Sequence, residues 1–293
     1  MRIKKHSPQI SWVAALSWIF GSTLLFSVVA HKIIRHHFSD KLRGENEEKI
    51  EYVVQTGLYK EALHSDCLME VLELSSDRPE KFSSFDVVAA QRKLDNFPII
   101  AKAVVKKIPP NMVYIDYSLR KPLFAVADFS NAVLDGEGAL FPVRPFFSPK
   151  KLTEVRFGQD GLKESGALDF GAILKGRYVD LTFSLLEFLG SKGKDLFFVK
   201  TIDVSAAFSE RLGKREVVLV LENDIHIAGQ ELPLVSTHYL RISPKDYCRE
   251  IENYLQLREH LLEVEKEEAA ILGVKILKEK TIDLRLSQLA FIR

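Results

Sequence analysis

The residues from Ile10 to Ala30, ISWVAALSWIFGSTLLFSVVA, form one unbroken apolar stretch without a charged side chain. A helix rises about 1.5 Å per residue, so this stretch would span roughly 30 Å, the thickness of the hydrocarbon core of a bilayer. No second stretch of this kind follows in the sequence. The pattern therefore predicts a single-pass membrane protein with a cytoplasmic tail (1–9), a transmembrane helix (10–30) and a juxtamembrane linker (31–48).

The alternative interpretation of this stretch is a cleaved secretory signal. MRIKKHSPQ is a fair basic leader, and Val28-Val29-Ala30 resembles a small-residue cleavage site. The apolar core of a signal peptide is typically about 7–15 residues long, however, and this one is longer, which favours a retained anchor. The positive charges on the two sides of this stretch are almost equal in number, so the positive-inside rule does not decide its orientation. We expect the tail to be cytoplasmic because an N-terminal signal-anchor normally exports the chain that follows it.

Composition narrows the class of the exported part. At roughly 100–200 residues per domain, it has room for two domains. The net charge is +1, so no nucleic acid or other polyanionic partner is implied. The two cysteines, Cys67 and Cys248, are far apart in the sequence. A disulfide between them is possible in an exported domain, but two unpaired buried thiols are the favoured interpretation.

Residues 49–122 predict a small domain in which a sheet carries two helices on one face. Clean alternation in MVYIDYSLR places Val113, Ile115 and Tyr117 on one side of a strand. Asp86 is placed to cap a short helix that ends before Pro98. The expected order is a strand over 49–57, helices over 60–74 and 87–94, and a hairpin of strands over 99–107 and 112–120.

Residues 123–293 predict a strand-rich domain. We expect short strands around the turn Asp135–Gly138, an irregular segment over 145–176, and a helix over 178–189. Strands then follow, with Asn223-Asp224 as a hairpin turn between two of them. A long helix over 244–271, capped by Ser243, has an acidic far end, which we interpret as a solvated face rather than a protruding partner-binding helix. Two strands close the chain.

Catalytic signatures are missing from the exported part. No GxSxG, HExxH, P-loop or SxxK motif occurs there. Gly136-Glu137-Gly138 belongs to a turn, and neither His226 nor His238 has a cysteine or paired carboxylate nearby in the sequence. Both are interpreted as structural or surface residues, and the juxtamembrane histidines His31, His36 and His37 as a solvated interfacial segment. We therefore expect no enzyme activity, no cofactor, no metal and no small-molecule substrate.

Three sequence segments carry a family resemblance. Phe97-Pro98-Ile99-Ile100-Ala101-Lys102-Ala103-Val104-Val105 is followed by a Pro-containing turn and by the strand that ends in Leu119-Arg120-Lys121-Pro122-Leu123-Phe124-Ala125. Ala132 to Phe141, AVLDGEGALF, and Thr281-Ile282-Asp283-Leu284-Arg285 come later in the chain. Together they resemble the bacterial division proteins of the FtsQ/DivIB family. In that family a Glu-Arg-x-Pro stands where this chain has Leu119-Arg120-Lys121-Pro122.

The resemblance implies a fold class and a function. The fold class is α+β, with the N-terminal transmembrane helix, a POTRA domain (β-α-α-β-β, 49–122) and an FtsQ-type β domain (123–293) with a long C-terminal helix and final edge strands. The function is that of a non-enzymatic scaffold in the inner membrane, with periplasmic domains at the division septum. It would bind FtsB/FtsL-like membrane proteins, and possibly others through the POTRA domain.

Strand addition is the physical route that the resemblance suggests, with a partner segment pairing along an exposed edge strand. Here the matching strand would run from Thr281 to Phe291, and an ordinary core strand is the alternative interpretation. The implied partner-binding residues are Thr281, Ile282, Asp283, Leu284, Arg285, Leu286, Ser287, Leu289 and Phe291.

Two other functions remain open. The first is a POTRA-containing component of outer-membrane assembly or secretion, which holds extended polypeptide clients. Such proteins usually carry several POTRA copies or a barrel, and this sequence shows no long series of ~10-residue amphipathic strands. The second is a membrane-tethered envelope hydrolase, which would need a nucleophile or metal site.

Overall fold

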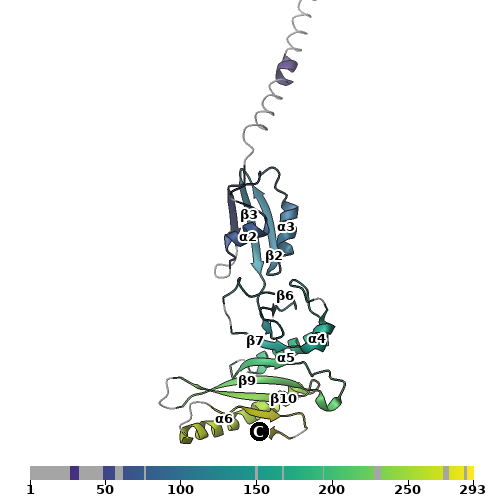
Figure 1. The fold of residues 1–293 in the computed structure, drawn as a ribbon. Helices are drawn as coiled ribbons and strands as arrows, with labels where there is room; N and C mark the ends of the chain where they lie inside the picture. Colours follow the sequence, from purple (N-terminus) through teal and green to yellow (C-terminus); the bar gives the residue numbers. More distant parts are fainter. Residues whose placement is uncertain are drawn as a thin grey trace, which may run out of the picture.

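The computed structural model describes residues 27–32, 49–56, 62–75, 77–148, 151–166, 168–193, 195–227, 232–272, 277–286 and 289–293. These residues form two sheets, one after the other along the chain, which lie end to end in Figure 1. A separate helical segment at 27–32 precedes them.

The first sheet belongs to a small domain with three strands. Its elements follow the predicted order: β1 (Tyr52–Thr56), α2 (Ser65–Val71), α3 (Val87–Asp95), β2 (Ile100–Ile108) and β3 (Met112–Leu119). The sheet order is β1-β3-β2, with β1 parallel and β2 antiparallel to β3. Asp86 caps α3 as expected, because its carboxylate accepts the backbone N–H groups of Val88 and Ala89.

The alternation of inward and outward side chains along β3 determines which of its residues enter the core of this small domain. Val113, Ile115 and Tyr117 are buried, as the sequence pattern predicts. They pack with Leu68 of α2 and Leu94 of α3, both fully buried. The opposite face of the sheet is open to solvent.

The second sheet is large and mixed. Its strands are β4 (Phe124–Val126), β5 (Val133–Leu134), β6 (Leu140–Phe141), β7 (Thr153–Arg156), β8 (Phe198–Asp203), β9 (Val217–Ile225), β10 (Leu234–Ile242), β11 (Lys280–Asp283) and β12 (Phe291–Ile292). Among the described residues they lie in the order β12-β11-β10-β9-β8-β7-β4-β5-β6. Strands β4, β7 and β8 are mutually parallel neighbours, and β11 is parallel to β10.

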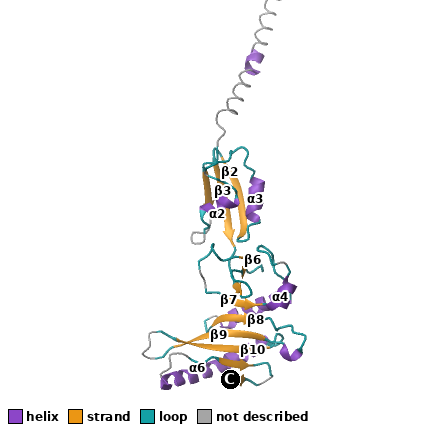
Figure 2. Ribbon diagram, in the orientation of Figure 1, coloured by secondary structure: helices purple, strands orange, loops and turns teal. Residues whose placement is uncertain are grey.

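Helices make two of the crossovers that these parallel pairs require, whereas β4 is connected to β7 through β5 and β6. Between β7 and β8 lie α4 (Gly158–Ser165) and α5 (Arg177–Gly193), and between β10 and β11 lies α6 (Tyr247–Leu272). A short 3-10 turn, η1 (Leu212–Lys214), precedes β9. Figure 2 shows α6 lying along the sheet near its C-terminal edge.

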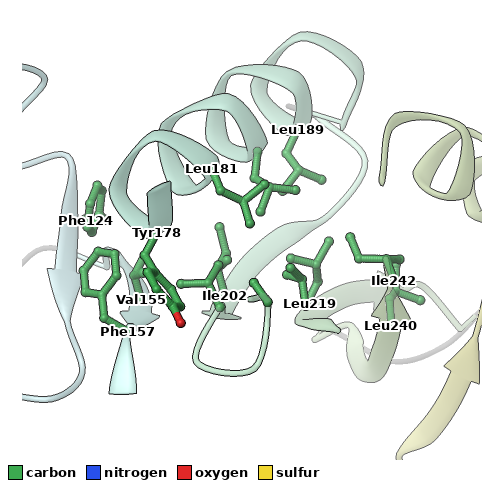
Figure 3. Close-up of a cluster of buried hydrophobic side chains, with 14 of the residues drawn as sticks. Phe124, Val155, Phe157, Tyr178, Leu181, Leu189, Ile202, Leu219, Leu240 and Ile242 are labelled. Atoms are coloured by element: carbon green, nitrogen blue, oxygen red, sulfur yellow. The ribbon is translucent and has the colours of Figure 1, made fainter. Parts of the chain in front are cut away.

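One apolar cluster joins α5 and α6 to the same face of the large sheet. Leu181 and Leu189 of α5 lie over Ile202, Leu219 and Leu240 of the strands (Figure 3). The other buried residues that Figure 3 labels are Phe124, Val155, Phe157, Tyr178 and Ile242.

The predicted fold class is wrong as stated, because it begins with a transmembrane helix over 10–30. Within the described part of the chain, no helix combines the length and the apolarity needed to cross a membrane. Of the predicted span, only 27–30 are described, and 10–26 lie outside the described residues. The second domain is also more than a strand-rich β domain, since helices cover one face of its mixed sheet.

Local predictions fail at three further places. The segment over 145–176 is not irregular throughout, because it contains β7 and α4. Asn223-Asp224 is not a hairpin turn, because β9 continues through both residues and pairs them with β10. Cys67 and Cys248 are both free thiols, but neither is buried, because Cys67 is half-buried and Cys248 is exposed.

An ion pair between the partly buried Arg120 and the buried Asp135 ties the two sheets together. Arg120, just after β3, contacts the carboxylate of Asp135 at 2.7 Å and donates through Nε to the carbonyl of Pro98. The second carboxylate oxygen of Asp135 accepts the N–H groups of Glu137 and Ala139 in the turn between β5 and β6. Around this pair, Phe141 and other side chains of the second sheet join the apolar cluster of the small domain.

Removing this ion pair should destabilise the protein strongly. We expect Arg120→Met to lower the free energy of unfolding by about 3 kcal/mol, because Asp135 is left as a buried charge without its partner. Urea denaturation would measure the change. The control is Lys121→Met at the neighbouring exposed position, which should change stability by less than about 0.5 kcal/mol. Equal effects of both substitutions would contradict a structural role for the pair.

Candidate partner-binding edge

The sequence predicts one strand over 281–291, but the structure has two strands at this C-terminal edge of the large sheet. Its first part is β11, which is an interior strand with β10 on one side and β12 on the other. Its last part reaches β12, the strand that ends the sheet. The open edge is therefore at Phe291–Ile292, and the pairing surface of β11 is already occupied.

Backbone geometry shows which groups of β12 face outward. Thr281 and Arg293 exchange both N–H to C=O hydrogen bonds, each at 3.0 Å. Successive residues of a strand direct these groups to opposite sides. The N–H and C=O of Ile292 therefore point away from β11, toward the open side of the sheet.

Exposed apolar side chains surround this edge. Phe291 is 54% exposed and Ile292 is 47% exposed, and Leu286 and Leu289 before them are exposed to a similar degree. An edge strand with an apolar surface is a template for pairing with another chain. Native proteins protect such edges with charges, prolines or very short strands; β12 is short, with two residues, but neither residue is charged or proline.

A cleft of about 450 Å³ lies beside the edge, between α6 and the segment that leads to β12. Apolar side chains from both walls line it, together with three polar side chains of α6 at positions 249, 253 and 256. The lining residues are Arg249, Asn253, Gln256, Leu257, Leu284, Leu289 and Ala290. A side chain from a segment paired with β12 could enter this cleft.

A cluster of four charged side chains fixes the end of β11. Arg285 holds the Asp283 carboxylate with two hydrogen bonds of 2.9 and 2.7 Å, and Arg241 of β10 lies 3.2 Å from it. Glu216, just before β9, pairs with both arginines. The hydrogen bonds from Arg285 hold the pKa of Asp283 below its usual range, against the opposing effect of burial. Asp283 and Arg285 therefore already have partners within the fold.

A second polar cluster, buried except for the partly exposed Lys280, joins α6 to β10 and β11. The Glu265 carboxylate of α6 accepts a hydrogen bond from Ser236 at 2.5 Å and lies 3.0 Å from His238 Nε2 and 3.1 Å from Lys280 Nζ. On its other side, His238 Nδ1 is 2.8 Å from the Tyr254 hydroxyl. Burial raises the pKa of Glu265, but these donors outweigh burial and hold that pKa below its usual range.

Sequence reasoning missed this cluster. His238 was interpreted as a lone structural or surface residue, because its partners lie 16 and 27 positions away along the chain. The available signal was a polar residue at an inward-facing position of an alternating strand, opposite a long helix.

The structure places the predicted binding residues in different environments. Thr281, Ile282 and Asp283 lie in β11; Leu284, Arg285 and Leu286 follow it; and Leu289 and Phe291 lie at the edge. Ser287 lies outside the described residues. Ile282 and Leu284 are buried, so of this set the residues open to a partner are Leu286, Leu289 and Phe291.

No group of three or more potential metal ligands occurs among the residues that the structure describes. In comparisons with known proteins, no family model matches the sequence. No curated protein matches it either.

Burial separates two neighbouring leucines of this region. Leu284 is 3% exposed and Leu286 is 56% exposed. We expect Leu284→Ala to lower the free energy of unfolding by about 2–4 kcal/mol, because it removes packing from the core. Leu286→Ala is the matched control and should change it by less than about 0.5 kcal/mol. Chemical denaturation of both variants checks this, and a comparable loss in both would show that the segment is packed differently.

Proposed function

We propose that this chain is a non-enzymatic binding protein of the bacterial division complex, and that it binds a partner by strand addition at β12. The observation that carries the proposal is the open edge at Phe291–Ile292, with outward backbone groups and exposed apolar side chains. The identity of the complex rests on the sequence resemblance to the FtsQ/DivIB family.

Binding at this edge would combine backbone hydrogen bonds with the burial of apolar side chains. Each main-chain hydrogen bond contributes about 0.5–1.5 kcal/mol net. Ile292 offers one donor and one acceptor, so backbone pairing alone would give weak binding. Burying the exposed side chains of Leu289, Phe291 and Ile292 adds apolar area at about 25 cal/mol per Å². The partner segment should therefore be extended and apolar at alternate positions.

The partner that we propose is an FtsB/FtsL-like membrane protein, as the resemblance implies. Its extended segment would lie along β12 at the division septum, on the periplasmic side of the inner membrane. The edge is also well placed for access, since it lies at the end of the protein farthest from the small domain in Figure 1.

A proline at position 292 tests the backbone contribution directly. Proline lacks an N–H group but is tolerated on edge strands where that group faces solvent. We expect Ile292→Pro to bind the FtsB/FtsL-like pair at least about fivefold more weakly than Ile292→Ala, because one hydrogen bond of about 1 kcal/mol is lost. Both variants lack the isoleucine side chain, so they differ mainly in the backbone, where proline removes the N–H group and also fixes φ.

The measurement is the dissociation constant of the purified chain for the FtsB/FtsL-like pair from the same bacterium. Circular dichroism of both variants would confirm that they fold alike. Equal affinity of the two variants would exclude strand addition through the Ile292 amide. Absence of any binding by the unmodified chain would overturn the proposed partner class.

A further inference from the structure

The open edge of the large sheet is complementary to itself. Arg293 exchanges both backbone hydrogen bonds with Thr281, so its N–H and C=O face β11. Phe291 lies two residues earlier and opposite Asp283, so its backbone groups face β11 as well. Ile292 between them directs one donor and one acceptor outward. In an antiparallel ladder, two residues directly opposite each other exchange both bonds. Ile292 of one copy and Ile292 of a second copy therefore match.

This match determines the symmetry of the pair. Two antiparallel strands with the same residue at their centre are related by a twofold axis. Here the axis passes between the two Ile292 residues, perpendicular to the sheet. A twofold interface uses the same surface on both copies, so it closes after two. The pairing therefore joins two large sheets into one continuous sheet.

The register of this pairing gives the side chains of the open face a partner. Phe291 lies opposite Arg293 of the second copy, in a non-hydrogen-bonded pair whose Cα atoms are about 4.5 Å apart. Because the twofold axis is perpendicular to the sheet, both side chains lie on the same face. Phe291 is 54% exposed and Arg293 is also exposed, so both side chains are accessible. An arginine over an aromatic ring makes a favourable cation–π contact, and the symmetry provides two such contacts.

The other face of the edge adds an apolar contact. Ile292 pairs with Ile282, whose side chain is buried in the cluster that joins α6 to the sheet. Ile292 therefore points to the α6 side of the sheet, where it is 47% exposed. Across the axis the two isoleucines are direct cross-strand neighbours, with Cβ atoms about 4.5–5.5 Å apart. Each covers apolar surface of the other, so both faces of the paired edge gain contacts.

The small size of this interface limits its strength. Stable interfaces bury about 1,200–2,000 Å² of surface, and β12 has only two residues. The paired edge buries less surface than a stable interface does. We therefore expect a weak dimer that forms and dissociates as the protein concentration changes.

We infer that β12 pairs with β12 of a second copy of this chain in an antiparallel, twofold dimer. The dimer uses the same Ile292 backbone groups that the proposed function assigns to a partner strand, so the two pairings exclude each other. The consequence, that self-pairing withholds the edge from the partner, rests on the proposed function. The dimer itself requires no partner.

Sedimentation equilibrium of the full chain over a wide range of concentrations tests the inference. The average mass should rise toward that of a dimer. Ile292→Pro removes the outward N–H of both copies, so the symmetric pair loses two hydrogen bonds, whereas a pair with a partner strand loses one. A fivefold weakening per bond becomes about 25-fold, so the dimer of Ile292→Pro should dissociate with a constant about 25-fold that of Ile292→Ala. Equal constants, or an unmodified chain that is monomeric at every concentration, would overturn the inference.

A charge swap tests the register. Phe291→Arg places a second cation opposite Arg293 of the other copy, and like charges directly opposite each other destabilise a strand pair. We expect this variant to dimerise at least about fivefold more weakly than the unmodified chain. Adding Arg293→Glu to Phe291→Arg restores opposite charges and should return the dissociation constant to within about twofold of the original value. Failure of the double variant to recover dimerisation would contradict the inferred pairing.

Hydrogen exchange measured by NMR tests the unmodified chain without any substitution. The Ile292 amide should exchange rapidly at low concentration, where the chain is monomeric, and more slowly as the concentration rises. The amides of β2 and β3 in the small domain are the internal control and should show no such change. An Ile292 amide that is insensitive to concentration would refute the dimer.

The outcomes for the dimer and for the proposed function are distinguishable. A chain that stays monomeric but still binds its partner through Ile292 overturns this inference alone. A chain that dimerises but binds no partner overturns only the proposed function.

Discussion

The parallel pairing of β10 with β11 determines where the open edge of the large sheet lies. Parallel neighbours need a crossover, and α6 supplies it by returning along the face of the sheet. The side of α6 that faces the sheet must pack against it. Ile251, Tyr254 and Leu261 form the apolar part of this contact. Glu265 then meets His238 and Lys280 in the polar part. This contact, the backbone pairing of β10 with β11 and the ion pair between Arg241 and Asp283 together hold β11 where β12 can pair with it.

The ion pair between Arg120 and Asp135 gives this edge a fixed relation to the rest of the molecule. It joins the end of β3 to the turn between β5 and β6, and the apolar cluster of the small domain continues across the junction. Phe97 of the small domain and Phe146 of the second meet edge to face, with ring centroids 5.7 Å apart. A partner held at β12 is therefore held at a defined distance from the small domain.

How far the sequence predicts this structure depends on the range of the interactions involved. Local rules suffice for β3, whose alternation places Val113 and Ile115 inward, and for α3, whose cap is Asp86. These local rules fail at Asn223, because asparagine is typical of turns but this residue lies inside β9. Its side chain is bonded to Tyr254 and Arg258, more than 30 positions away. The sequence pattern predicts one strand over 281–291, because pattern alone cannot show that β11 pairs on both sides or that β12 is a separate strand antiparallel to it.

We propose that a partner strand pairs with the outward backbone groups of Ile292. Amide hydrogen exchange at this one residue, measured by NMR with and without the FtsB/FtsL-like pair, tests it most directly. The account predicts that the Ile292 amide exchanges rapidly in the free chain, because it faces solvent, and becomes strongly protected in the complex. If the complex forms and the Ile292 amide remains as unprotected as in the free chain, the partner binds elsewhere and strand addition at β12 is wrong.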